Sequence, residues 1–164
     1  MYIPFEQLPD QSRVWVYQAN RRLMANEIEQ ISSFLTYEMN AWAAHGAPLN
    51  ASFEIRFGQV VIVAVNEDVN QASGCSIDAS TRWFKSLGDL LQVDFFDRQI
   101  ARIQGEQISL IPITSIKDFI LSAHLLEEDF IIPPQTSDLR QYRNQWLQTV
   151  RESWLKKYLA KSSV

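Results

Sequence analysis

The chain has 164 residues and a formal charge of −4, with 46% hydrophobic and 21% charged residues. These values are typical of a globular domain and exclude a disordered polypeptide, so we expect one domain over residues 1–164. The longest apolar run, residues 60–65, is far shorter than the ~20 residues of a membrane-spanning helix.

The start of the chain has no basic patch followed by an apolar stretch, so we expect no secretory signal. The single cysteine, Cys75, excludes an internal disulfide framework. Together these features predict a cytoplasmic protein.

A strand and a helix are predicted first. Residues 13–19 are rich in β-branched and aromatic side chains, which favours a strand. Apolar residues then recur at three- and four-residue steps from Ile28 to Trp42, which indicates a helix. Asn26 is its predicted N-cap, and Gly46 follows its predicted end.

Two strands joined by a tight turn are expected next. Apolar and charged residues alternate over 53–57, the pattern of a strand with one side in water. Gly58 and Gln59 form the predicted two-residue turn. Residues 60–65 are apolar without alternation, so this strand should lie in the centre of a sheet.

A second amphipathic helix follows. Its apolar stripe extends from Ile77 to Leu91, with Cys75 or Ser76 near its N-cap and Asp78 in its first turn. Four more elements are predicted towards the C-terminus: a strand at 93–98, a hairpin of 99–104 with 107–113, a short helix from Ser115 to about Leu126, and a final helix at 138–161 packed on the body.

This order of elements matches the ferredoxin-like βαββαβ pattern. We therefore expect an α+β fold, a mainly antiparallel sheet with a ferredoxin-like start that is extended by one or two strands and two C-terminal helices. In that topology the loop of His45 and the loop of Cys75 lie at one end of the sheet. Arg21 and Arg22 lie at the opposite end, beside Gly58.

Cys75 is the most chemically suggestive residue of the chain. Amides at a helix N-terminus favour the anionic form of a thiol. In a catalytic interpretation, Cys75 is the nucleophile, His45 accepts its proton and the Ser76 amide holds an oxyanion. In the alternative interpretation, Cys75 is a small buried apolar residue, as free cysteines commonly are.

Other polar residues near these loops are weaker candidates. Asp78 is either an acid–base group or a charge that stabilises the helix start. Asn66 and Asn70 are candidate ligand-binding residues, although turns also favour asparagine. Arg21 and Arg22 either bind an anion ahead of the first helix or are solvated.

No metal site or cofactor is expected, because two histidines and one cysteine are too few for a structural or His-rich site. Trp83 immediately precedes the stripe residue Phe84, so we expect it to be partly exposed and available for a homodimer or partner contact.

The predicted last helix is basic, with six basic and two acidic residues over 138–161. It either complements the acidic body or binds nucleic acid weakly. The isoelectric point near 5.2 argues against nucleic acid. The residues of that alternative are Arg140, Arg143, Arg151, Lys156 and Lys157.

Two segments are distinctive: residues 65–78 and the run Val93-Asp94-Phe95-Phe96-Asp97-Arg98. They resemble the signature of a family of small uncharacterised bacterial proteins whose members are often labelled ABC transporter ATPases, and the similarity extends over most of the chain. The family has no established activity, so the resemblance implies no catalytic residue.

The transporter label itself requires a G-x-x-x-x-G-K-[ST] loop that wraps the phosphates. The five glycines of this chain are scattered, and none precedes a Lys-Ser or Lys-Thr pair. ATP binding is therefore not expected.

No motif in the sequence defines a reaction. We therefore expect a non-catalytic accessory domain that binds a small ligand or a protein at the Cys75 end of the sheet. A thiol-dependent enzyme of the acyl-transfer or redox class is the alternative, and nucleic-acid binding is a third hypothesis.

Overall fold

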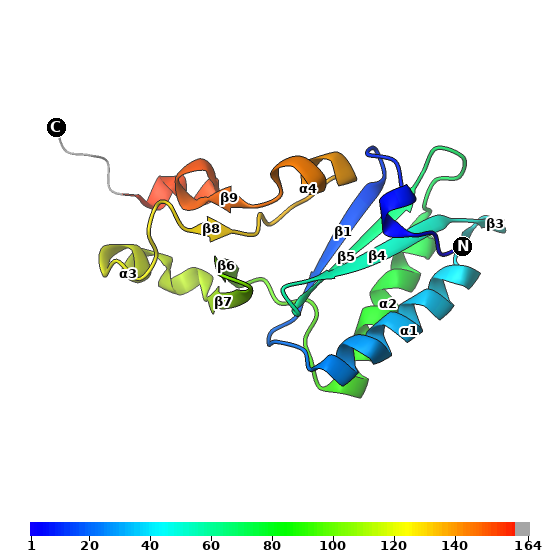
Figure 1. Cartoon of the computed structure of the whole chain (residues 1–164), viewed down its shortest axis with the longest axis horizontal. Coiled ribbons are helices and arrows are strands. Elements are labelled where there is room, and N and C mark those ends of the chain that lie inside the picture. The colour runs from blue at the N-terminus through cyan, green and yellow to red at the C-terminus, as the bar shows by residue number, and fades with distance from the viewer. Residues whose placement is uncertain (160–164) are drawn as a thin grey trace. The chain divides into compact units, whose positions relative to one another are not determined.

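The computed structural model describes residues 1–159 and contains helices and mainly antiparallel sheets, so the prediction of an α+β fold is confirmed (Figure 1). The chain divides into two compact units. Unit 1 consists of Met1–Asp97 and Gln135–Asn144, and unit 2 of Arg98–Pro134 and the residues from Gln145 onward. A single domain over the whole chain stays a prediction.

Unit 1 is built on a three-stranded antiparallel sheet. Its strands are β1 (Arg13–Gln18), β4 (Asn50–Arg56) and β5 (Val60–Asn66), in the order β1-β5-β4. The apolar residues of β5 are buried on both faces, which confirms that this strand is central.

Two long helices, α1 (Ala25–Ala41) and α2 (Gly74–Leu91), lie side by side against one face of this sheet (Figure 1). Their stripes enter one core with the sheet. The N-cap of α1 is Met24 rather than the predicted Asn26, because the Glu27 carboxylate accepts the Met24 backbone N–H over 2.8 Å. Shorter elements of unit 1 are the 3₁₀ helix η1 (Phe5–Gln7), the strands β2 (Ala43–Ala44) and β3 (Ala47–Pro48), and α4 (Leu139–Gln145).

The turn between β4 and β5 lies one residue earlier than predicted. Its central residues are Phe57 and Gly58, with φ of 55° and 58°. Two left-handed residues in sequence are the geometry of a type I′ turn, which matches the twist of the strands it joins.

The prediction of a strand at 93–98 is wrong. The Asp94 carboxylate accepts the backbone N–H of Phe96 over 2.8 Å, which bends the chain and withdraws that amide from a ladder. A single parallel bridge, Gln18 with Phe96, and a hydrogen bond from the Asn20 N–H to the Asp94 carbonyl over 2.9 Å tie this segment to the end of β1 without a ladder. The ferredoxin-like start is therefore not confirmed, since its fourth strand is not formed here.

Unit 2 contains a small four-stranded sheet of order β7-β6-β8-β9. The hairpin of β6 (Ile100–Gln104) and β7 (Gln107–Ile111) confirms the predicted turn at Gly105. The other elements are η2 (Ile113–Ser115), α3 (Ile116–Leu121), β8 (Phe130–Ile131), β9 (Gln148–Thr149), η3 (Val150–Glu152) and η4 (Trp154–Tyr158). Helix α3 ends at Leu121 and not at the predicted Leu126. Two residues after its end, Ala123 adopts a left-handed φ of 58°.

The single helix expected over 138–161 is not formed over the described residues. Helix α4 ends at Gln145, and two short 3₁₀ helices follow. The hydroxyls of Thr149 and Ser153 cap these helices by accepting the backbone N–H groups of Glu152 and Leu155. Such side-chain contacts compete with a continuous helix. Residues 160 and 161 of the predicted helix lie outside the described residues.

Candidate functional site

Unit 1 carries a cleft of about 770 Å³ where the end of α1 meets the start of α2. The walls come from three places in the chain: the last turn of α1, the short β2–β3 hairpin and the first turns of α2. The lining residues are Glu38, Ala41, Trp42, Ala43, His45, Ser73, Gly74, Cys75, Ser76, Ala79 and Trp83.

Two buried indole rings line this cleft, and we call this buried aromatic part of the lining its floor. The rings of Trp42 and Trp83 meet edge to face, with centroids 4.8 Å apart and an interplanar angle of 65°, a favourable geometry for aromatic pairs. Trp83 is only 8% exposed, so the prediction of a partly exposed ring is wrong. Trp83 packs against Trp42 and belongs to the core of unit 1.

Trp42 also makes a polar contact with α2. Its Nε1–H donates to the backbone carbonyl of Ser76 over 2.9 Å, in a buried position. This bond joins the end of α1 to the first turn of α2. The floor of the cleft therefore belongs to the rigid core of unit 1.

The β2–β3 hairpin, residues 43–48, forms one wall, and we call it the flap. His45 and Gly46 are its two turn residues, with φ of 52° and 80°. Both lie in the left-handed region, which is the requirement of a two-residue type I′ turn. His45 is exposed at the tip and lines the cleft.

Ser73 is the N-cap of α2, rather than the predicted Cys75 or Ser76. Its Oγ accepts the backbone N–H of Ser76 over 3.2 Å, and its own backbone N–H donates to the Ser76 Oγ over 2.7 Å. This reciprocal pair has the form of a capping box. Both the amide and the hydroxyl of Ser76 are thus engaged within the helix start.

The structure brings three of the predicted catalytic candidates to one cleft. His45, Cys75 and Ser76 all line it, and the Cys75 thiol is exposed, so the interpretation of Cys75 as a buried apolar residue is wrong. Their convergence follows from the chain topology, as the sequence predicts. Asp78 is exposed on α2 and is not among the lining residues.

Asn66 and Asn70 do not line the cleft and instead shape the loop before α2. The Asn66 Oδ1 accepts the Asp68 backbone N–H over 3.0 Å, as in an Asx turn. The Asn70 Nδ2 group faces backbone carbonyls of the flap, with the nearest, from Ala47, at 2.9 Å.

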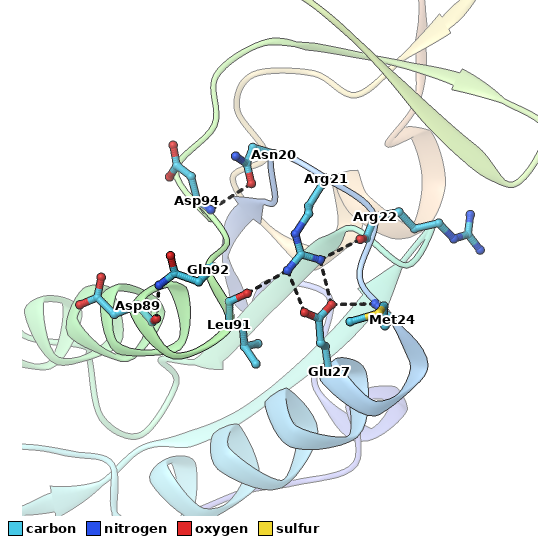
Figure 2. A network of polar contacts seen from close by, with 9 residues as sticks. All are labelled: Asn20, Arg21, Arg22, Met24, Glu27, Asp89, Leu91, Gln92 and Asp94. Carbon is cyan, nitrogen blue, oxygen red and sulfur yellow. Dashed lines mark hydrogen bonds and ion pairs between the residues drawn. The ribbon is translucent and has the colours of Figure 1, made fainter.

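Arg21 lies at the other end of α1, within a network of polar contacts (Figure 2). Its guanidinium donates two hydrogen bonds to the Glu27 carboxylate, over 2.9 and 2.8 Å, and one to the carbonyl of Leu91 over 2.8 Å. These bonds hold the pKa of the Glu27 carboxyl below its ordinary value. Arg21 therefore ties the start of α1 to the end of α2.

Arg22 points away from this network in Figure 2 and is exposed. A Cβ added to Gly58 would lie 3.7 Å from its Nε atom, so the side chain runs beside the β4–β5 turn. The 17 residues of α1 separate Arg21 and Arg22 from the cleft, a span of roughly 25 Å. The two arginines and Cys75 belong to different ends of unit 1.

The basic residues near the C-terminus do not share one helix. Arg143 pairs with Asp10 over 2.7 Å, and Arg151 pairs with Glu127 and Glu128, each over 2.5 Å. Arg140 belongs to α4, whereas Lys156 and Lys157 belong to η4. The charge pattern of the sequence therefore does not give a continuous basic helix face within residues 1–159.

Within residues 1–159, no three His, Cys, Asp or Glu side chains gather in a way that would hold a metal ion. None of the described helices combines the length and the apolar character that a membrane crossing requires. Comparisons of the chain with protein-family models, curated proteins and solved structures find no match.

Sequence reasoning missed the floor of the cleft. It assigned Trp42 to a helical stripe and treated Trp83 as a surface residue, although their contact defines the site. Apolar residues that pack in a core and apolar residues that line a binding site recur at the same helical spacing. The sequence therefore holds no signal that distinguishes a core tryptophan from one that lines a site. It also missed the roles of Glu38, Ala41 and Ala79 in the walls.

Proposed function

We propose that unit 1 is a non-catalytic binding domain whose cleft takes a small ligand with a flat apolar part. The observation that carries this proposal is the cleft of about 770 Å³ with the edge-to-face pair of Trp42 and Trp83 at its floor. Small-molecule sites commonly have volumes of ~300–1,000 Å³ and mostly apolar, aromatic walls.

Three polar side chains at the walls suit the orientation of such a ligand. Glu38, His45 and Cys75 supply a carboxylate, an imidazole and a thiol, and Ser73 and Ser76 also line the cleft. A few placed polar groups are what gives an apolar site its specificity. The engaged amide of Ser76 supports binding over catalysis, because the oxyanion donor of the catalytic hypothesis already bonds Ser73.

A fluorescence titration with 8-anilinonaphthalene-1-sulfonate tests this proposal, since the dye reports apolar sites. The variant Ala79→Phe places a ring in the cleft, and Ser86→Phe adds the same ring at an exposed position of α2 outside it. We expect saturable binding to the wild type, at least tenfold weaker binding to Ala79→Phe, and unchanged binding to Ser86→Phe. Equal affinities for all three proteins would contradict the proposal.

A thiol-dependent enzyme is the second candidate, because His45 and the exposed Cys75 line the same cleft. Cys75 is the only cysteine, so its alkylation is measured without interference. If the pair acts together, iodoacetamide reacts with the native protein at pH 7 at least tenfold faster than with free cysteine, and His45→Ala abolishes that excess. A rate equal to that of free cysteine removes this candidate.

The wider assignment is part of the same proposal. In this proposal the protein is a cytoplasmic accessory domain and a member of the family of small bacterial proteins that it resembles. It acts as a monomer or as a homodimer. The sheet order β1-β5-β4 supports a ferredoxin-like origin of unit 1 that lacks the fourth strand. Sedimentation of the full chain over a range of concentrations tests the homodimer.

A further inference from the structure

One polar side chain, that of Asn70, contacts the backbone of the flap, residues 43–48, at three carbonyls. We infer that the flap is a movable cover of the cleft and that Asn70 is its latch, a positioning residue that does not touch the ligand. This inference rests on the proposed function of the cleft.

The contacts of Asn70 define the latch. Its Nδ2 group lies 2.9 Å from the carbonyl oxygen of Ala47, 3.3 Å from that of Ala44 and 3.4 Å from that of Pro48. One amide group with two protons thus serves three carbonyls of the flap. Asn70 belongs to the loop before α2, so the contact joins this loop to the flap.

The rest of the flap's support comes from Ala44, which packs into the core of unit 1, and from the buried residues at its two ends, Trp42 and Leu49. The flap contains two strand pairs, Ala43 with Pro48 and Ala44 with Ala47, and two-stranded hairpins are marginally stable by themselves. Only Ala44 of the flap is buried, and its side chain is a single methyl group. The hairpin base is closed by the Leu49 N–H, which donates to the Trp42 carbonyl over 3.0 Å.

Opening of the latch would change one wall of the cleft and leave the floor in place. His45 moves with the flap, because it is one of the two turn residues. Trp42 and Trp83 stay in the core of unit 1, where they are 4% and 8% exposed. The strength of the Asn70 contacts therefore sets how often the cleft opens to a ligand.

Amide hydrogen exchange on the full-length protein, followed by NMR, tests the latch directly. In Asn70→Ala we expect the amides of the flap and of Leu49 to exchange at least tenfold faster, with the amides of β5 unchanged. Asn66→Ala is the matched control, because it removes an asparagine side chain at the end of β5, where the same loop begins, and this side chain bonds Asp68 rather than the flap. Its flap amides should exchange as in the wild type.

A second readout separates a latch from ordinary structural support. The association and dissociation rates of 8-anilinonaphthalene-1-sulfonate, measured by stopped flow, should both rise at least threefold in Asn70→Ala. If Asn70→Ala fails to fold, hydrogen exchange of the wild type provides the test. The latch predicts that the Asn70 side-chain amide protons are protected from exchange as strongly as the Leu49 backbone amide.

Flap exchange that is the same in Asn70→Ala and the wild type would overturn the latch. Asn70 side-chain protons that exchange as freely as in a short peptide would also overturn it. A faster flap in a protein whose wild type binds no dye would instead refute the proposed function and leave the latch standing.

Discussion

The indole N–H of Trp42 donates to the carbonyl of Ser76 over 2.9 Å and so joins the last turn of α1 to the first turn of α2. Both residues also line the cleft. The hydrogen bond therefore links the packing of unit 1 to the geometry of its candidate site.

Replacement of Trp42 by Phe keeps an aromatic ring and removes this donor. The buried Ser76 carbonyl then loses a partner, and we expect a loss of about 1–2 kcal/mol in the free energy of unfolding. Denaturant titration measures this loss. Trp154→Phe, at a half-exposed ring of η4, is the control and should change stability by less than about 0.5 kcal/mol. Equal losses in the two variants would argue against a role for the bond.

Ser73 caps α2 through its side-chain oxygen, which accepts the Ser76 backbone N–H. The stability of the helix start therefore depends on a hydrogen-bond acceptor in the side chain at position 73. Ser73→Ala should lower the free energy of unfolding by about 1 kcal/mol, whereas Ser73→Asp keeps an acceptor and should stay near the wild type. Thermal unfolding followed by circular dichroism distinguishes the two. The assignment fails if Ala and Asp destabilise the protein to the same extent.

Glu27 should contribute stability that depends on pH. The hydrogen bonds from Arg21 lower the pKa of the Glu27 carboxyl in the folded protein. Its contribution is therefore fully present above the pKa of the unfolded chain, about 4.3, and is lost as the pH falls through the lower folded value. Because Glu27 is buried and Arg21 partly exposed, we expect Glu27→Gln to cost about 2 kcal/mol at pH 7.

The measurement is the difference in unfolding free energy between the wild type and Glu27→Gln from pH 7 to pH 3. We expect this difference to shrink toward zero at the acid end. Glu29→Gln, at an exposed position of the same helix, should show no difference at any pH. A constant Glu27 difference down to pH 3 would disprove the linkage.

Gly88 allows the close turn at the end of α2. A Cβ at this position would lie 2.6 Å from the Val93 carbonyl oxygen, whereas a Cβ at Gly74 meets nothing within 4 Å. Gly88→Ala should therefore destabilise by about 2 kcal/mol despite its better helix propensity. Gly74→Ala should be neutral or slightly stabilising. Denaturant midpoints of the two variants test this contrast, which the reverse order would contradict.

The two long helices could be predicted from the sequence because each carries an unbroken apolar stripe. The predicted helix at 138–161 also carries such a stripe, but Thr149 and Ser153 interrupt it with hydroxyls that cap 3₁₀ turns instead. The spacing of apolar residues alone does not show whether such local hydrogen bonds will interrupt the helix. The strand expected at 93–98 fails for a similar reason, at Asp94.

The meeting of His45 and Cys75 at one cleft could be predicted because it depends only on α1, β4 and β5. The absence of the fourth strand does not affect it. The role of Asn70 could not be predicted, since a turn asparagine and a latch look alike until the carbonyls of the flap are placed around it. The Trp42–Trp83 contact also needs the packed helices.

The central claim is that the cleft between α1 and α2 binds a small ligand on its indole floor. Chemical-shift mapping by NMR with 8-anilinonaphthalene-1-sulfonate tests it most directly, through the indole N–H signals of the full-length protein. We predict saturable shifts for Trp42 and Trp83, with Trp154 unmoved. Shifts confined to Trp154, or the absence of any saturable shift, would contradict the claim.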